Sequence, residues 1–117
     1  GAAQAEPNKA EAVFRVGGDW DTEWGALILT QEGPDVTGSY PSYDGGRVIG
    51  VMADMVFTGH WLQNESSQSC GQVRDGTAYW GRLILTFDNE GTAFAGRWSY
   101  CDAEPSGTWD GSLQAVH

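Results

Sequence analysis

The chain has few basic residues and no long hydrophobic run. Six Lys and Arg residues stand against sixteen Asp and Glu residues, which gives a formal net charge of −10. Nucleic acids and anionic membrane surfaces bind basic patches, so this charge predicts neither of them as a partner. No apolar run approaches the roughly 18 residues that a membrane-spanning helix needs, and we therefore expect no membrane insertion.

Histidine is almost as scarce, since only His60 and His117 occur. No Ser-His-Asp or Cys-His set can be assembled around them. The acidic run of Asp19, Asp21 and Glu23 lacks the glycine and the distal glutamate of a calcium-binding loop. We therefore predict no catalytic residues, no metal and no cofactor, and we favour a binding protein over an enzyme.

Cysteine is limited to Cys70 and Cys101. An even count in a small acidic chain indicates one disulfide and an oxidising compartment, although two unrelated thiols would give the same count. We therefore expect a secreted or periplasmic protein. The Ala-rich start of the chain is compatible with the remainder of a processed signal peptide.

Strong helix formers never build a periodic run, whereas glycine and aromatic residues abound. There are seventeen Gly, six Trp, four Tyr and four Phe residues, a composition that favours an all-β chain with many turns. Residues 1–11 are polar and lack periodicity, which predicts a flexible N-terminal tail. Residues 12–117 have the size of a single domain with one core.

Alternating apolar residues and turn signals divide residues 12–117 into eight predicted strands. Residues 24–30 resemble residues 80–86, and each segment is followed by a turn and a Gly-x-aromatic motif. Two such four-stranded meanders would close into an antiparallel up-and-down β-barrel, which leaves no exposed sheet edge. A β-sandwich is the main alternative. The predicted strands span residues 12–20, 24–31, 36–40, 47–52, 55–62, 77–87, 92–100 and 107–115.

A Gly-x-Trp or Gly-x-Tyr motif occurs five times. Residues two apart in a strand share a face, so each copy places bare backbone beside a large ring on what we take to be the inner face. In a meander these rings fall at the end of the barrel that carries the longer loops and both cysteines, so a Cys70–Cys101 disulfide is geometrically allowed. The copies lie at residues 18–20, 38–40, 59–61, 96–98 and 107–109.

Rings at one end of a barrel can either fill it or line an open pocket. The longer loops favour a pocket for a small organic ligand, and acidic residues mapped to the same end would attract cationic ligands. Trp24 and Trp80 could face inward or outward. Five predicted residues supply stacking and apolar walls, namely Trp20, Tyr40, Trp61, Trp98 and Trp109. Thr22 and Ser42 are the predicted hydrogen-bonding residues.

The stretch from Gly18 to Ser42 resembles the start of the avidin and streptavidin family. Gly18-x-Trp20, Gly25 and Gly38-x-Tyr40 match that family in order and spacing. The resemblance covers the first three strands. It implies an eight-stranded barrel, similar in plan to lipocalins, that binds biotin at its open end and forms dimers or tetramers.

The resemblance also assigns roles to single residues. Tyr40 falls where the family has a tyrosine that binds the ureido oxygen of biotin, and Ser42 falls where a pocket serine often lies. Thr22 and Ala26 depart from the family, which has an asparagine and a serine at these two places.

Residues 27–29 and 83–85 are both Leu-Ile-Leu, apolar on both faces of their strands. The outward residues could pack against another subunit or under the N-terminal tail, and we predict a homo-oligomer. Two alternatives to a binding protein stay open. One is a self-assembling extracellular structural subunit with a filled barrel, and the other is a cyclase-like barrel enzyme that folds a flexible substrate against its tryptophans.

Overall fold

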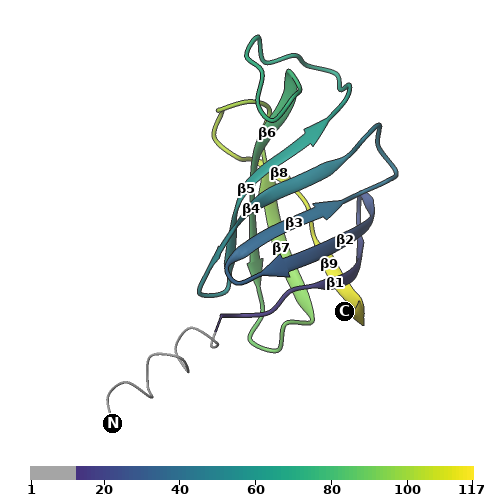
Figure 1. Cartoon of the computed structure of the whole chain (residues 1–117), viewed down its shortest axis with the longest axis vertical. Coiled ribbons are helices and arrows are strands. Elements are labelled where there is room, and N and C mark those ends of the chain that lie inside the picture. Colours follow the sequence, from purple (N-terminus) through teal and green to yellow (C-terminus); the bar gives the residue numbers. More distant parts are fainter. Residues whose placement is uncertain (1–12) are drawn as a thin grey trace.

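A computed structural model describes residues 13–117, and in this part of the chain it shows a closed antiparallel barrel of eight strands and no helix (Figure 1). The predicted all-β barrel is confirmed, and the β-sandwich is excluded. The predicted tail of residues 1–11 lies outside the described residues. Within them, no helix is long and apolar enough to cross a membrane.

Each strand pairs with its neighbours in the chain, and the sheet closes on itself. The pairing runs from β1 through β7 in sequence order, β7 pairs with both β8 and β9, and β9 pairs with β1. The strands are β1 (Gly18–Thr22), β2 (Gly25–Glu32), β3 (Asp35–Ser39), β4 (Arg47–Ala53), β5 (Val56–Gln63), β6 (Tyr79–Phe87), β7 (Ala93–Trp98), β8 (Gly107–Thr108) and β9 (Gly111–Val116).

The predicted eighth strand is broken into β8 and β9 at Trp109 and Asp110. Acidic side chains take over the pairing at the break. The amide of Gly96 donates to Asp110 Oδ1 over 3.3 Å, and the amide of Asp110 donates to Glu23 Oε1 over 2.8 Å. The break therefore ties the end of the barrel wall to the turn between β1 and β2.

The first strand begins later than predicted, at Gly18 rather than at residue 12. The Gln31 side chain replaces a strand partner for the preceding residues. Its Oε1 accepts from the amide of Val16 over 2.7 Å, and its Nε2 donates to the carbonyl oxygen of Phe14 over 2.8 Å. This segment is therefore held by a side chain and not by a strand ladder.

The half of the barrel away from the long β5–β6 and β7–β8 loops, called the lower half below, is filled with apolar side chains. The Trp20 ring lies 5.3 Å from both Phe87 and Phe94, and the leucines of the two repeats pack inward around these rings. The isoleucines between them, Ile28 and Ile84, are half-buried on the outer face. The homo-oligomer that these outward residues suggested stays a prediction.

Several glycines give room to a ring on the neighbouring strand. Gly81 is the cross-strand partner of Trp61, and Gly107 is the partner of Trp98. A Cβ atom added at either glycine would collide with the opposite indole. The glycine-rich strands therefore let large rings lie flat against the barrel wall.

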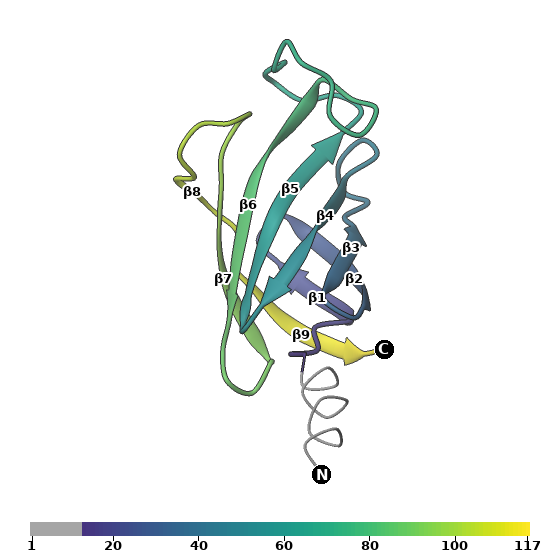
Figure 2. The same cartoon turned by 60° about the vertical axis from the view of Figure 1, so that its left-hand side comes forward.

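The longer connections gather at one end of the barrel (Figure 2). Residues 64–78 join β5 to β6, and residues 99–106 join β7 to β8. The predicted disulfide links these two loops, since Cys70 and Cys101 are bonded and their Cα atoms lie 5.5 Å apart. A disulfide indicates a compartment outside the reducing cytoplasm.

Candidate ligand-binding site

A cavity of about 350 Å³ lies at the loop end of the barrel, between the upper strands and the loops. Aromatic rings make most of its wall, and polar residues lie among them. The aromatic residues are Trp24, Tyr40, Tyr43, Trp61, Trp98, Tyr100 and Trp109. The polar residues are Asp44, Gln63, Glu65, Ser66 and Ser67.

Three of these rings stand perpendicular to one another. The planes of Trp61 and Trp98 meet at 87°, those of Trp98 and Tyr100 at 86°, and those of Trp61 and Tyr100 at 80°. Such edge-to-face contacts are the arrangement that aromatic quadrupoles favour. The result is an aromatic corner of three perpendicular rings, all of which line the cavity.

The indole N–H groups of the wall all donate to acceptors of the protein itself. Trp24 and Trp98 both donate to the carbonyl oxygen of Thr108, over 2.7 and 3.1 Å. Trp61 donates to the carbonyl oxygen of Ser99 over 2.9 Å. Trp109 donates to the Thr22 hydroxyl over 3.0 Å. These bonds fix the rings in place and leave ring surfaces, not N–H donors, for a ligand.

Tyr40 is a buried member of the wall, with only 1% of its surface exposed. Its hydroxyl lies 3.2 Å from the carbonyl oxygen of Leu62 and 3.0 Å from Oε1 of Gln63, and it donates to these acceptors. Burial raises the pKa of Tyr40 far above its ordinary value, although nearby Arg47 opposes this. The phenol therefore remains neutral across the physiological pH range.

Two carboxylates lie at the cavity, each on a loop. Asp44 follows β3 and Glu65 follows β5, and their loops are bonded because the amide of Asn64 donates to the carbonyl oxygen of Asp44 over 2.8 Å. Among residues 13–117, no Lys, Arg or His forms a salt bridge with either carboxylate. Their charge is thus free of a cationic partner within the described chain.

The predicted site residues divide into two groups. Tyr40, Trp61, Trp98 and Trp109 come together in the cavity wall. Trp20, Thr22 and Ser42 do not line it.

Each residue of the second group has a definite place. Trp20 packs in the filled lower half, because β1 does not end at Trp20 as predicted but continues to Thr22, which leaves Trp20 two residues below the observed strand end. Thr22 lies behind Trp109 as its hydrogen-bond acceptor. Ser42 is exposed on a loop next to Gly25.

Residues outside the predicted set complete the wall, chiefly Trp24, Tyr43, Tyr100 and the two carboxylates. Tyr100 continues the inward alternation of residues 94, 96 and 98, and this signal could have identified it. Trp24 does face the cavity. Tyr43 and Glu65 lie in loops, where no strand period predicts the direction of a side chain.

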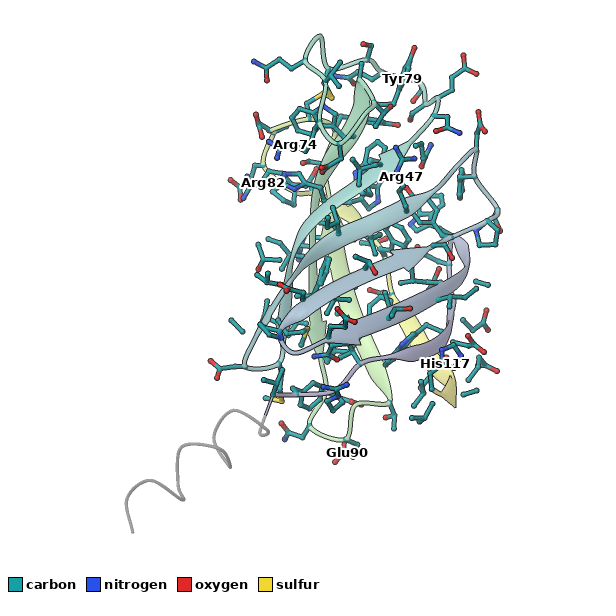
Figure 3. The ribbon with its side chains drawn as sticks, viewed as in Figure 1. Arg47, Arg74, Tyr79, Arg82, Glu90 and His117 are labelled. Atoms are coloured by element: carbon teal, nitrogen blue, oxygen red, sulfur yellow. A yellow bond between two sulfur atoms is a disulfide. The ribbon has the colours of Figure 1, made fainter. Side chains whose placement is uncertain are left out.

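Trp80 lies on the outer face of the barrel, yet only 1% of its surface is exposed. The loop of residues 64–78 covers it. The Arg74 guanidinium carbon lies 4.7 Å from the centre of the Trp80 ring, and Trp80 Nε1 donates to the carbonyl oxygen of Gln72 over 2.9 Å. Arg74 and Arg82 are seen beside β6 at this end in Figure 3. Trp80 therefore anchors the loop that carries Glu65.

A second hollow, of about 370 Å³, lies at the opposite end of the barrel beside Val16, Glu90 and His117. Its rim carries charges of both signs, and it lacks the ring cluster of the loop end. Within residues 13–117, no three His, Cys, Asp or Glu side chains are grouped so that they could hold a metal ion.

Comparison with known proteins adds no relative. No protein-family model, no curated protein and no solved structure matches this chain.

Proposed function

We propose that this chain is a non-enzymatic binding protein of a secreted or periplasmic compartment, which holds a small organic ligand in the aromatic cavity at its loop end. The observation that carries the proposal is the cavity itself. Its volume of about 350 Å³ is in the range of small-molecule sites, and such sites are mostly apolar with a few polar groups.

The packing below the cavity supports one-sided binding. Trp20, Phe87 and Phe94 fill the barrel beneath the site, so a ligand can enter only from the loop end. Three of the wall rings, Trp61, Trp98 and Trp109, come from β5, β7 and the break between β8 and β9, and they are held by the barrel ladder and by indole hydrogen bonds. A wall that is ordered before binding lowers the entropic cost of binding.

The polar lining supports binding over catalysis. Among the described residues of the cavity, the ionisable side chains are Asp44, Glu65 and three tyrosines. Covalent catalysis by a serine needs an adjacent base, and Ser67 instead pairs with the Tyr100 hydroxyl over 2.7 Å. The disulfide that joins the two rim loops supports an oxidising compartment.

Ligand titration followed by tryptophan fluorescence tests the proposal. The panel contains biotin, other small cyclic molecules and small organic cations, and at least one of them should change the emission saturably. Tyr100→Leu should weaken that binding about tenfold, because it removes ring contact of about 1.4 kcal/mol.

The matched control is Tyr79→Leu, a change of the same kind at the same end of the barrel but outside the cavity lining (Figure 3). It should leave the affinity unchanged. The absence of saturable binding across the whole panel would overturn the proposed function, as would equal losses in the two variants.

A further inference from the structure

The cavity offers acceptors and ring faces but few free donors. The four indole N–H groups of its wall are bonded to Ser99, Thr108 and Thr22, and the Tyr40 hydroxyl donates to Leu62 or Gln63. The amide nitrogen of Gln63 donates to the carbonyl oxygen of Glu65 over 2.9 Å. These donors are therefore not available to an anionic ligand, which would find neutral hydroxyl groups such as those of Tyr43 and Ser66.

The loop end of the cavity, called its mouth below, carries negative charge that no salt bridge among residues 13–117 neutralises. Asp44 and Glu65 line the cavity, and no Lys or Arg does so. The nearby cation Arg47 forms no salt bridge with either acid, and its guanidinium donates to the carbonyl oxygen of Gly45 over 2.8 Å and to Asn64 Oδ1 over 3.3 Å. The net charge of −10 adds a long-range field of the same sign.

The aromatic corner suits a cation whose charge is spread over alkyl groups. Trp61, Trp98 and Tyr100 stand at 80–87° to one another, so several negative ring faces can surround one positive centre. A primary ammonium needs acceptors for three N–H donors, which the faces of these three rings do not provide. Each alkyl group on the nitrogen removes one N–H donor, and a quaternary ammonium has none to satisfy.

We propose that the cavity binds an organic ammonium cation with methyl or similar small alkyl groups on nitrogen. The alkyl groups rest against Trp61, Trp98 and Tyr100, while Asp44 and Glu65 supply charge at the mouth. This inference rests on the proposed ligand-binding function and names the chemical class of the ligand.

Calorimetric titration of the full chain with choline tests the inference directly. The matched probe is dimethylbutanol, the uncharged isostere of choline in which carbon replaces the charged nitrogen. Choline should bind on the order of tenfold more tightly than the isostere, because only choline gains cation–π and carboxylate attraction. Added salt should weaken choline binding and leave binding of the isostere unchanged.

Two variants separate the contributions of charge and rings. Asp44→Asn with Glu65→Gln should reduce the preference for choline several-fold without weakening the isostere. The control, Asp54→Asn with Glu90→Gln, removes two acids from turns at the opposite end and should change neither affinity. Trp98→Leu should weaken both probes, and circular dichroism checks that each variant keeps its strands.

The outcomes distinguish this inference from the function on which it rests. Equal binding of choline and dimethylbutanol would overturn the cationic ligand and would leave the proposed function standing. Binding of biotin or of a neutral cyclic compound, with no binding of choline, would do the same. If no probe or panel compound binds, both proposals fail.

Discussion

Thr22 shows how a single residue can shape the cavity without lining it. Its hydroxyl accepts from Trp109 Nε1 over 3.0 Å and from the amide of Trp24 over 3.0 Å, and it donates to the carbonyl oxygen of Gly25 over 2.6 Å. One ring of the wall, Trp109, and the backbone that carries another, Trp24, therefore depend on one hydroxyl. A buried indole that loses its acceptor bears the full cost of desolvation.

Thr22→Val should lower the free energy of unfolding by about 1–3 kcal/mol, because Trp109 Nε1 is left without a partner. Urea denaturation measures the change. Thr22→Ser keeps the hydroxyl and should recover most of the stability. Thr30→Val, on the exposed face of β2, is the matched control and should have little effect. Equal losses for the two valine variants would contradict this role of Thr22.

Tyr40 should make the fold sensitive to alkaline pH. Burial raises its pKa in the folded state, so the unfolded chain releases this proton first. The contribution of the Tyr40 phenol to the free energy of unfolding is fully present below the unfolded-state pKa of about 10. It is lost as the pH rises from there toward the folded-state pKa. Urea denaturation at several alkaline pH values measures this slope. It should be shallower in Tyr40→Phe and unchanged in Tyr79→Phe, and an unchanged slope in Tyr40→Phe would contradict the assignment.

Among the strands, the pairing of a glycine with a ring is the recurrent device. Trp61 lies opposite Gly81 and Trp98 lies opposite Gly107. The Gly-x-aromatic motif predicted that its glycines leave room for a neighbouring ring, and this holds at Gly107, whereas a Cβ at Gly18, Gly38 or Gly59 would meet backbone or aliphatic atoms instead. The backbone carbonyl of Ser99 also approaches Gly81, so this position is closed on two sides.

Gly81→Ala should therefore lower the free energy of unfolding by about 1–3 kcal/mol, since the new methyl group collides with Ser99 and with Trp61. Thermal and urea denaturation both report the loss. Gly17→Ala is the control, because an added Cβ there meets its nearest atom at 3.6 Å. If Gly81→Ala were as stable as Gly17→Ala, the proposed close packing at Trp61 would be wrong.

Strand ends mark where prediction from the sequence succeeded and where it did not. The alternation of apolar residues and the repeated Leu-Ile-Leu segments were sufficient for an eight-stranded closed barrel, and the even cysteine count with both cysteines at one end was sufficient for the disulfide. The position of Trp20 depended on where β1 ends, and the structure extends that strand to Thr22. When a strand end moves by two residues, each side chain stays on the same face of the sheet but changes its depth in the barrel. The two-residue period alone therefore could not place the Trp20 ring.

Loops limited the prediction of the site in another way. Asp44, Glu65 and Tyr43 lie at the cavity because the β3–β4 loop and the β5–β6 loop bond to each other through Asp44 and Asn64. Trp80 is buried outside the barrel because the loop of residues 64–78 folds back over it. Both arrangements depend on contacts between distant loops, which carry no period in the sequence.

For the whole molecule, the Cys70–Cys101 bond joins the two loops of the cavity end across 31 residues. A cross-link of this span restricts the unfolded chain, and loss of such a bond from a small domain costs about 2–4 kcal/mol. It also keeps the loop that carries Glu65 against Trp80. Stability and the shape of the mouth are thus linked.

A reducing agent, or Cys70→Ser with Cys101→Ser, should lower the free energy of unfolding by about 2–4 kcal/mol, as measured by urea denaturation. Ligand binding should weaken at the same time, because the loop carrying Glu65 is no longer tied to the loop carrying Cys101. Reductant should have no effect on the double serine variant, which serves as the control. Unchanged stability after confirmed reduction of the bond would contradict this prediction.

The division of the cavity between strands and loops has a consequence for how such a protein can change over time. The strand residues of the cavity wall, such as Trp61 and Trp98, belong to the barrel and also pack in its core. Asp44 and Glu65 instead lie on loops that are not part of the core. Substitutions at the two acids can therefore alter which charge the mouth favours at little expense to folding. Proteins that descend from one such barrel can therefore keep the same aromatic wall and bind different ligands.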